Sequence, residues 1–387
     1  MTSMVYSNSQ PGPATRVLVI GVGHYPALLG GEGPLFPAHE GMRQLHSPPA
    51  SARTFARWLI EHYQSPQRPL ASVRLLVSEA RPQPFVYNCS GRAVTVQPLV
   101  ADMAGVRAAI LEWEQESQHV DDLMLFYFCG HGIANPASMA LLLSDFGRQR
   151  RSPFSGALDF FGFRAGMEDC TARQQCYFID ACRLNSTLLK QDAYAGDSVI
   201  QPSLVAAPGG RMRVGPTFYS TLAGDGSYGQ QGQPSVFTGA LLESLAGLAA
   251  GEEDGQDWTV KTCRLQTSLQ FLMDESIRIN HWDVLQQPIV DNLQDLQLNT
   301  LTQLPPVPVV VTVDPVNAHD EAELRYDDGD GNEDHRPADT APWSLRLPMG
   351  RYSFHAEFAS GRYDSVSMHN QDIRPPYQHR RLKAVAK

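Results

Sequence analysis

Two short segments of the chain carry the residue types needed for nucleophilic catalysis at a carbonyl group. Residues 126–132 read FYFCGHG and residues 177–183 read YFIDACR. A thiol attacks a carbonyl efficiently only as the thiolate, and a neighbouring imidazole can take its proton and later return one to a leaving amine. The pattern therefore predicts Cys182 as a nucleophile and His131 as its general base.

The residues around this pair suggest where negative charge would be stabilised. Glycines flank His131, and the backbone amides of Gly132 and Cys182 could donate hydrogen bonds to an oxyanion. Each residue alone also has a structural interpretation, because a cysteine at a strand end is commonly a small buried residue. It is the matched placement of His131 and Cys182 after two apolar runs that favours catalysis.

The elements that must position these side chains can be predicted from alternating apolar runs and amphipathic segments. Residues 123–129 are continuously apolar, and in 175–179 four apolar residues follow Gln175, which is typical of central strands in a parallel sheet covered on both faces. The other expected elements are strands at 16–22, 73–77 and 217–222, an irregular loop carrying Pro82, Pro84 and Asn88, and helices at 50–63, 102–118, 235–248 and 258–279. This alternation predicts a three-layer α/β/α domain with right-handed crossovers. If the two apolar strands are neighbours, His131 and Cys182 face each other across the crevice at the carboxyl edge of the sheet.

These motifs resemble those of the caspase and metacaspase family of cysteine peptidases, including bacterial caspase-like proteases of the peptidase C14 type. FYFCGHG is similar to the family's strand followed by Gly-His-Gly, and FIDACR is similar to its Asp-x-Cys motif. Fifty-one residues separate His131 from Cys182, in agreement with caspase spacing. The resemblance covers roughly residues 16–295 and implies a caspase-hemoglobinase fold, a Cys182–His131 dyad and an oxyanion amide from Gly132.

The resemblance also implies a specificity pocket. Asp180 occupies the position that in metacaspases lines the S1 pocket and selects Arg or Lys at P1, and a carboxylate can pair bidentately with a guanidinium. The alternative for Asp180 is a strand-end cap that orients the cysteine loop. A second acidic pocket residue of metacaspases is missing from residues 46–51, and Arg43 lies close by. An Arg in that region serves Asp-selective caspases, so Asp selectivity remains a second hypothesis.

Caspase-type enzymes are often cut in the loop after the catalytic cysteine. Residues 184–214 read as an exposed loop, and a second basic stretch precedes the cysteine strand. The candidate positions for self-cleavage are Lys190, Arg211 and Arg213 in the first segment and Arg151 in the second. Both segments could equally be ordinary surface loops.

The composition changes towards the C-terminus, which predicts separate domains. We expect a flexible N-terminus at 1–15, a catalytic domain at 16–300, a Pro-rich linker at 301–308 and a β-sandwich at 309–387. The sandwich resembles small β-domains that bacterial enzymes append for recognition. It is expected either to dock the protein substrate or an activating partner, or to act only as a stability module.

Charge and cysteine content narrow the partners and the location. A net charge of −10 argues against nucleic acid and anionic membrane surfaces as partners and favours a cationic protein or peptide substrate. The chain has no signal-like N-terminus and no apolar run that could span a bilayer. Its six scattered cysteines indicate reduced thiols, so we expect a cytoplasmic protein.

No metal or other cofactor is predicted. The acidic turn at 327–334 lacks the flanking helices and terminal Glu of a calcium loop, and a solvated hairpin turn is the preferred interpretation. The remaining candidates for metal binding lack ligand spacing on one helix face: His24, His39, His46 and His62. Calcium activation occurs in many metacaspases, but no ligands can be assigned to it here.

The favoured function is thus a cysteine endopeptidase cleaving a protein after a basic residue. A caspase-fold scaffold without activity is the main alternative, and a Cys-His hydrolase of small esters is a third. By resemblance alone, such an enzyme would act in programmed cell death or antiviral defence against phage.

Overall fold

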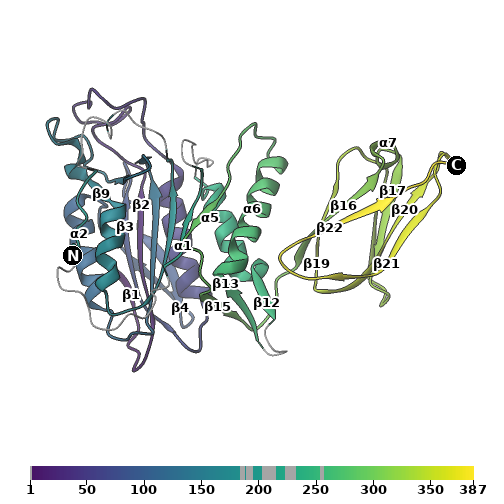
Figure 1. Ribbon diagram of the computed structural model, residues 1–387, viewed down its shortest axis with the longest axis horizontal. Coiled ribbons are helices and arrows are strands. Elements are labelled where there is room, and N and C mark those ends of the chain that lie inside the picture. The colour runs from purple at the N-terminus through teal and green to yellow at the C-terminus, as the bar shows by residue number, and fades with distance from the viewer. Residues whose placement is uncertain (1, 184–187, 189–194, 203–214, 223–231, 253–256) are drawn as a thin grey trace. The chain divides into compact units, whose positions relative to one another are not determined.

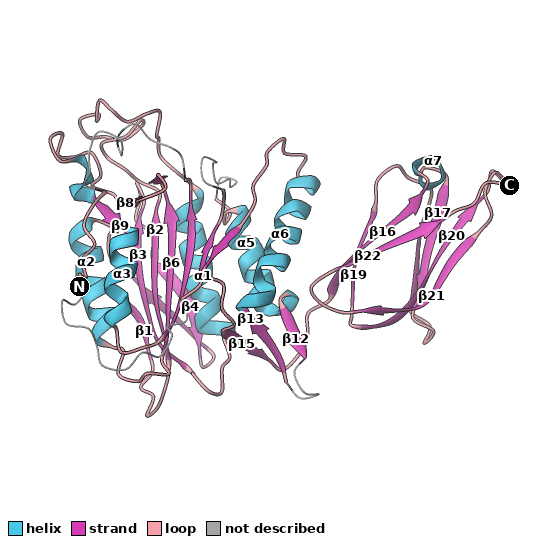
Figure 2. Cartoon of the chain, viewed as in Figure 1, coloured by secondary structure: helices cyan, strands magenta, loops and turns pink. Residues whose placement is uncertain are grey.

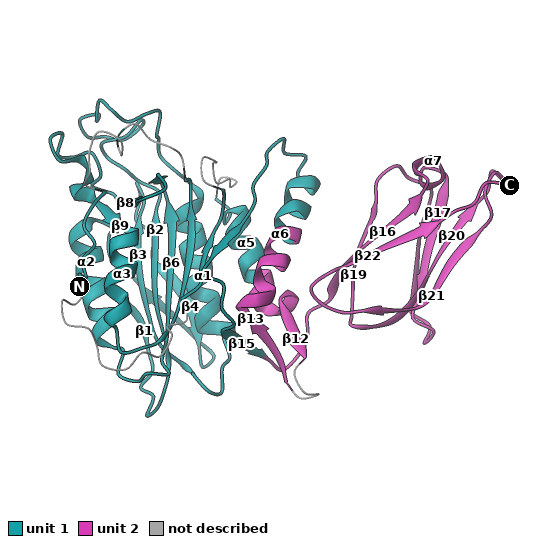
Figure 3. Ribbon diagram, viewed as in Figure 1, with its two compact units in different colours: residues 1–242, 272–300 teal, residues 243–271, 301–387 magenta. Residues whose placement is uncertain are grey.

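The computed structural model describes residues 2–183, 188, 195–202, 215–222, 232–252 and 257–387. The chain divides into two compact units, residues 1–242 with 272–300, and residues 243–271 with 301–387 (Figure 3). Each unit is described separately below.

The first unit is built around a seven-stranded sheet with the order β1-β3-β2-β6-β10-β11-β14. Its central strands are parallel, whereas the edge strands β1 and β14 are antiparallel to their neighbours. The strands are β1 (Met4–Ser7), β2 (Thr15–Val22), β3 (Leu70–Ser78), β6 (Leu123–Gly130), β10 (Gln174–Ala181), β11 (Thr217–Tyr219) and β14 (Ile289–Asp291). Every residue of β6 is buried, as expected for a continuous apolar run in the middle of a parallel sheet.

Helices cover both faces of this sheet (Figures 1 and 2). They are α1 (Ser47–His62) and α5 (Val236–Glu243) on one face, and α2 (Met103–Gln115) and α3 (Phe160–Gly166) on the other. On the α1 face, Phe55 stacks on Tyr127 with ring centroids 4.5 Å apart. On the opposite face, Phe163 packs against Phe126 at 5.2 Å. Consecutive residues of β6 therefore fill the two cores, and the three-layer α/β/α fold class expected from the sequence is confirmed.

Short elements complete this unit. They are the strands β4 (Phe85–Cys89), β5 (Arg92–Val96), β7 (Gly132–Ala134), β8 (Met139–Leu142), β9 (Ala157–Asp159) and β15 (Gln297–Leu301), with the short helical turns η1 (Pro153–Gly156) and η2 (Met167–Asp169). The sheet β7-β8-β9 follows directly on β6 and therefore sits beside His131.

Several local predictions need correction. The segment expected to be an irregular loop forms the β4–β5 hairpin, because Ser90 and Gly91 adopt the positive φ values of a tight hairpin turn. Residues 1–15 were expected to be flexible, yet Met4–Ser7 pairs with β3 as an edge strand and buries Val5. Asp102 caps α2 by accepting a hydrogen bond from the Gly105 amide.

The second unit contains a β-sandwich of two antiparallel-rich sheets, with orders β19-β16-β22 and β18-β17-β20-β21. Its elements are β16 (Val307–Asp314), α7 (Val316–His319), β17 (Ala322–Asp327), β18 (Glu333–Arg336), β19 (Trp343–Leu347), β20 (Gly350–Phe358), β21 (Val366–Ile373) and β22 (Gln378–Lys383). Alternate residues of β16 and β20 are buried against each other, which produces the period-2 pattern visible in the sequence.

The remainder of this unit comes from residues 243–271. It holds η3 (Ser244–Leu248), β12 (Ala250–Glu252), β13 (Trp258–Lys261) and the first part of α6 (Thr262–Ile279). The expected helix at 258–279 thus begins four residues late, because Trp-Thr-Val-Lys, with its aromatic and β-branched side chains, pairs with β12 as a strand.

Candidate active site

The strand pairing brings His131 and Cys182 to the same point of the sheet edge. Strands β6 and β10 are parallel neighbours, and their last paired residues are Gly130 and Ala181. His131 and Cys182 are the next residue of each strand, so both leave the sheet at its carboxyl edge. That edge is where open α/β sheets place their ligands.

The imidazole of His131 is held in one orientation by a backbone carbonyl. Its Nε2 lies 2.7 Å from the carbonyl oxygen of Arg43, which can only accept a hydrogen bond. Nε2 therefore carries the proton, and Nδ1 of the neutral ring is left as the acceptor. Burial lowers the pKa of His131, while the hydrogen bond to Arg43 opposes this shift. The ring is consequently neutral at pH 7, as a general base must be.

A second contact to His131 comes from Tyr25, a residue that the sequence analysis missed. The Tyr25 hydroxyl accepts a hydrogen bond from the His131 amide at 2.8 Å and donates one to the Leu142 carbonyl at 3.3 Å. Its ring packs on the imidazole with centroids 4.9 Å apart. Burial raises the pKa of Tyr25 well above its usual range, so this hydroxyl keeps its proton. In the sequence, the signal for Tyr25 is limited to the presence of an aromatic residue shortly after the β2 strand.

The backbone of Gly132 approaches Cys182 too closely for any side chain. A Cβ atom at position 132 would lie 2.6 Å from the Cys182 carbonyl oxygen and 3.0 Å from the Ala181 Cβ. Strand β7 pairs antiparallel with β8 so that Gly132 lies opposite Leu141, while the Leu142 amide donates to the His131 carbonyl. In an antiparallel ladder, pairs of residues that exchange hydrogen bonds alternate with pairs that do not. Because His131 and Leu142 are hydrogen-bonded, the next pair, Gly132 and Leu141, is not, and the Gly132 amide does not point to β8.

Burial distinguishes Cys182 from the other cysteines near the site. All six cysteines lie in the part of the chain that the structure describes, and none of the six forms a disulfide in that part. Cys182 is half-buried, whereas Cys129 and Cys176 are buried. Burial raises the pKa of both buried thiols, and for Cys129 the Asp180 carboxylate raises it further. Cys182 is thus the thiol of this edge that combines access with a neighbouring imidazole.

Asp180 lies at the centre of a buried polar cluster that links β10 to the start of α5. Its side chain is only 2% exposed. Oδ2 accepts hydrogen bonds from the hydroxyls of Ser235 and Thr238, the latter at 2.9 Å, and from the Cys129 thiol at 3.4 Å. The Ser235 hydroxyl also accepts a hydrogen bond from the Thr238 amide at 3.0 Å, as an N-cap serine does.

The cluster also includes side chains of β6 and α1. The Tyr127 hydroxyl lies 2.6 Å from Thr238 Oγ1, and Ser51 of α1 accepts the Ser235 amide at 2.9 Å. None of these hydroxyls could be linked to Asp180 from the sequence, because a lone hydroxyl carries no sequence signal of such a cluster.

Comparison with known proteins assigns the chain to a family. The sequence profile of the caspase domain, peptidase family C14, matches residues 14–270. The chain belongs to the caspase-domain family. Family membership indicates a cysteine peptidase, and the expected likeness to caspases is thereby confirmed.

Individual relatives of this caspase-domain protein are distant. It is 26% identical over 231 residues to the uncharacterised protein y4kE of Sinorhizobium fredii, with 56% of this chain and 62% of that protein covered. The match thus spans less than two thirds of that relative. Among solved structures, protein GSU0716 of Geobacter sulfurreducens has a TM-score of 0.41 at 14% identity, covering 72% of this chain and 93% of its own. Caspase-1 of Spodoptera frugiperda has a TM-score of 0.42 at 12% identity, covering 76% and 96%.

The other predicted site residues of this caspase domain lie as follows. Arg43 is exposed and contributes its backbone carbonyl to His131. Arg151 lies in an exposed turn before β9. Lys190, Arg211 and Arg213 lie outside the described residues, so the corresponding self-cleavage predictions concern a part of the chain that the structure does not describe.

Neither a metal cluster nor a membrane span is found in the described parts of this caspase-domain chain. Within those ranges, no three His, Cys, Asp or Glu side chains come together as metal ligands. Over the same residues, no helix is both long and apolar enough to cross a bilayer.

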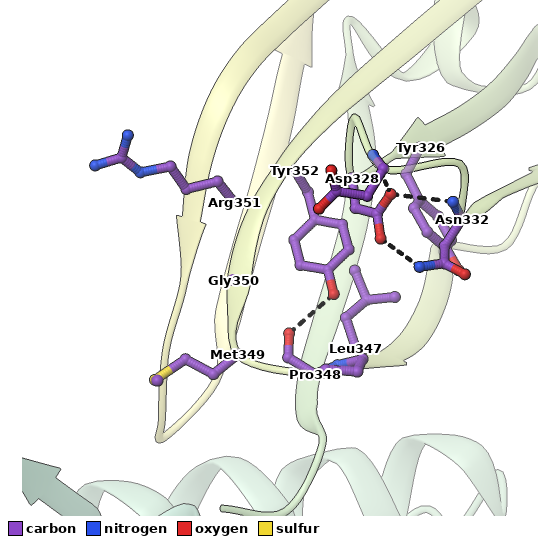
Figure 4. Close-up of a pocket in the computed structure, with 10 residues that line it drawn as sticks. Tyr326, Asp328, Asn332, Leu347, Pro348, Met349, Gly350, Arg351 and Tyr352 are labelled. Atoms are coloured by element: carbon purple, nitrogen blue, oxygen red, sulfur yellow. Dashed lines mark hydrogen bonds between the residues drawn. The ribbon is translucent and has the colours of Figure 1, made fainter.

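The β-sandwich of the second unit carries a pocket of its own (Figure 4). Its volume is about 590 Å³, and Tyr326, Tyr352 and Leu347 line it together with the acidic turn. Asp328 organises this turn by accepting hydrogen bonds from the backbone amides of Asp330 and Asn332 at 2.9 and 3.0 Å. The carboxylate is thus engaged within the hairpin, in line with the interpretation as a turn.

Proposed function

We propose that the protein is a cysteine endopeptidase in which Cys182 attacks the scissile carbonyl and His131 transfers the protons. The observation that carries this proposal is the pairing of Gly130 with Ala181, which delivers both side chains to one point of the sheet edge. The Arg43 carbonyl supports it further, because it leaves Nδ1 of His131 free to act as a base.

The chemistry then follows the geometry of the edge. Nδ1 of His131 takes the proton of Cys182, and the thiolate adds to the carbonyl carbon to give a tetrahedral intermediate. The amides of Gly132 and Cys182 donate to its oxyanion. The imidazolium gives its proton to the leaving amine as the C–N bond breaks, and a thioester remains on Cys182. Water, deprotonated by His131, hydrolyses this thioester and regenerates the thiol.

For substrate preference we infer a basic P1 residue that is recognised by Asp180. Its carboxylate lies on the residue two before Cys182 and accepts three side-chain hydrogen bonds in a buried cluster. A guanidinium or ammonium that joined this cluster would form a charge-assisted pair in a poorly solvated site. The hydroxyls of Ser235 and Thr238 would hold the carboxylate in place for it.

The first experiment compares wild type, Cys182→Ala and Cys263→Ala on peptide reporters ending in Arg, Lys, Asp or Leu, with and without calcium. Cys263 is an exposed thiol on α6, so its removal controls for a non-specific cysteine effect. We expect cleavage after Arg and Lys in wild type and Cys263→Ala, and a loss of at least about 1,000-fold in Cys182→Ala.

Other outcomes would separate the competing functions. Cleavage after Asp would keep the dyad and transfer the specificity role to the Arg43 side chain. Equal activity of Cys182→Ala and wild type would refute the dyad. Silence on every peptide, combined with no labelling of Cys182 by a small alkylating reagent, would favour the scaffold. Hydrolysis of small esters without peptide cleavage would favour the esterase.

We further propose a role for the β-sandwich and a cellular setting. The aromatic and acidic lining of the pocket in Figure 4 suits a cationic segment of the protein substrate or of an activating partner. Self-processing at Arg151, and action in cell death or defence against phage, rest on resemblance. Incubating the purified protein and Cys182→Ala side by side tests self-processing, because only the active chain would become shorter.

A further inference from the structure

A second cavity lies at the same carboxyl edge of the main sheet, on the far side of His131 from Cys182. It has a volume of about 170 Å³ and is lined by His24 after β2, Ser78 and Glu79 at the end of β3, and Arg148 after β8. Tyr25, the residue after His24, contacts the His131 ring. The cavity therefore adjoins the catalytic edge without including the proposed dyad.

The proposed reaction determines which part of a substrate would extend towards this cavity. The leaving amine must lie at His131, since the imidazolium gives it a proton. His131 directly follows β6, which lies between β10 and β2, and β3 lies beyond β2. A substrate that crosses the edge from Cys182 past His131 thus places its leaving-group side over the ends of β2 and β3.

The spacing of the strands indicates which residues would reach the cavity. Neighbouring strands lie about 4.8 Å apart, so the ends of β2 and β3 lie roughly 10–14 Å from the end of β10. An extended peptide advances about 3.3 Å per residue. The third or fourth residue after the scissile bond would therefore lie over the cavity, whose volume accommodates roughly five water-sized groups, about the size of one Glu side chain.

The carboxylates that line the cavity are already engaged by the protein. Glu79 accepts hydrogen bonds from the Arg53 guanidinium through both oxygens, at 3.0 Å for the longer contact. It also accepts the Gln83 amide at 2.5 Å. Asp102 accepts the Gly105 amide at 2.8 Å at the start of α2, where the helix dipole favours its negative charge.

The basic side chains that line the cavity are paired less completely with carboxylates. His24 pairs with Glu32 at 2.7 Å, and Arg53 is occupied by Glu79. Arg148, in contrast, is exposed and forms no ion pair with any residue that the structure describes. The charge of Arg148 acts on Asp145, whose carboxylate accepts a hydrogen bond from the Met103 amide. The charge that remains available to a ligand is thus the guanidinium of Arg148.

We propose that this cavity is a specificity subsite for an acidic side chain, Glu or Asp, at the third or fourth residue on the leaving-group side of the scissile bond. Arg148 supplies the charge that recognises it. This inference rests on the proposed peptidase function. Together with Asp180, it describes a substrate that is basic before the cleavage point and acidic a few residues after it.

The test uses quenched fluorescent peptides with a common Arg at P1 and Glu, Gln or Lys at the third and fourth positions after it. Wild type, Arg148→Glu and Arg150→Glu are compared at low and high salt. Arg150 is exposed in the same turn but does not line the cavity, so it controls for a general change of surface charge.

We expect wild type and Arg150→Glu to prefer Glu over Lys by roughly two- to fivefold in kcat/KM, the effect of one exposed or half-exposed pair. Arg148→Glu should reverse this order, and high salt should weaken it. Equal cleavage of all peptides by wild type, or the same change in both variants, overturns the subsite while leaving the peptidase intact. Absence of cleavage in the whole series, combined with no labelling of Cys182 by a small alkylating reagent, refutes the peptidase itself, and the subsite falls with it.

Discussion

Substitution of Gly132 by Ala tests the geometry of the proposed active site most directly. The added Cβ would lie 2.6 Å from the Cys182 carbonyl oxygen and 3.0 Å from the Ala181 Cβ. A carbon and a carbonyl oxygen in contact normally lie about 3.3 Å apart, so one of the two strand ends must move by about 0.7 Å. The backbone that carries the nucleophile cannot remain where it is.

The expected cost can be worked from that displacement. A misplacement of about 1 Å at reacting groups costs about 100-fold in rate, so a movement of about 0.7 Å predicts a loss of roughly 10- to 100-fold in kcat/KM. Each factor of ten corresponds to about 1.4 kcal/mol in the barrier. Overpacking should also lower the free energy of unfolding by about 1–3 kcal/mol.

Gly239→Ala is the matched control for this variant. Gly239 lies within α5, and a Cβ there would meet no atom within 4 Å. Alanine should stabilise the helix by up to about 1 kcal/mol and leave the cleavage of Arg reporters unchanged. The assays are kcat/KM on an Arg reporter, thermal unfolding, and the rate at which a small alkylating reagent labels Cys182.

A Gly132→Ala protein that is folded and as active as Gly239→Ala would contradict this reasoning. The close approach of the two strand ends would then not matter for the reaction. A large loss of activity with an intact thermal transition, in contrast, would place the effect at the site and not in global folding.

Three further predictions concern the residues around the dyad. Asp180→Asn should lower kcat/KM on Arg and Lys reporters by about 100-fold or more, because the charged partner of P1 is removed, and an unchanged preference for basic P1 residues would refute its role. Tyr25→Phe removes the hydroxyl between the His131 amide and the Leu142 carbonyl, and chemical denaturation should show a loss of about 1–3 kcal/mol in unfolding free energy. Because burial lowers the pKa of His131, the acid limb of the kcat/KM profile should lie below the ordinary histidine value of about 6.5. The lowered pKa also makes the free energy of unfolding depend on pH: the neutral ring contributes stability above about pH 6.5, and this stability is lost as the pH falls towards the lowered folded-state pKa. An acid limb of the kcat/KM profile above pH 6.5 would contradict a neutral buried ring.

Local sequence determined which two residues we propose as the reactive pair, and the layers that carry them. The runs at 123–129 and 176–179 are continuously apolar, so burial on both faces of a parallel sheet follows from their composition alone. Polar residues that come directly after such runs must emerge at a strand end, and this sufficed to pair His131 with Cys182. Where the local signal was ambiguous, as in Trp-Thr-Val-Lys at 258–261, the expected helix proved to start after a strand.

Tertiary structure decided how these residues are held. The carbonyl that orients the His131 ring is 88 residues away in the chain, and the Tyr25 hydroxyl is 106 residues away. Asp180 meets Ser235 and Thr238 across 55 and 58 residues. Such contacts arise where loops and helix ends meet at a sheet edge, and they follow no residue period. A backbone carbonyl, moreover, is present in every residue, so no side-chain type could have marked Arg43 as the partner of the His131 imidazole.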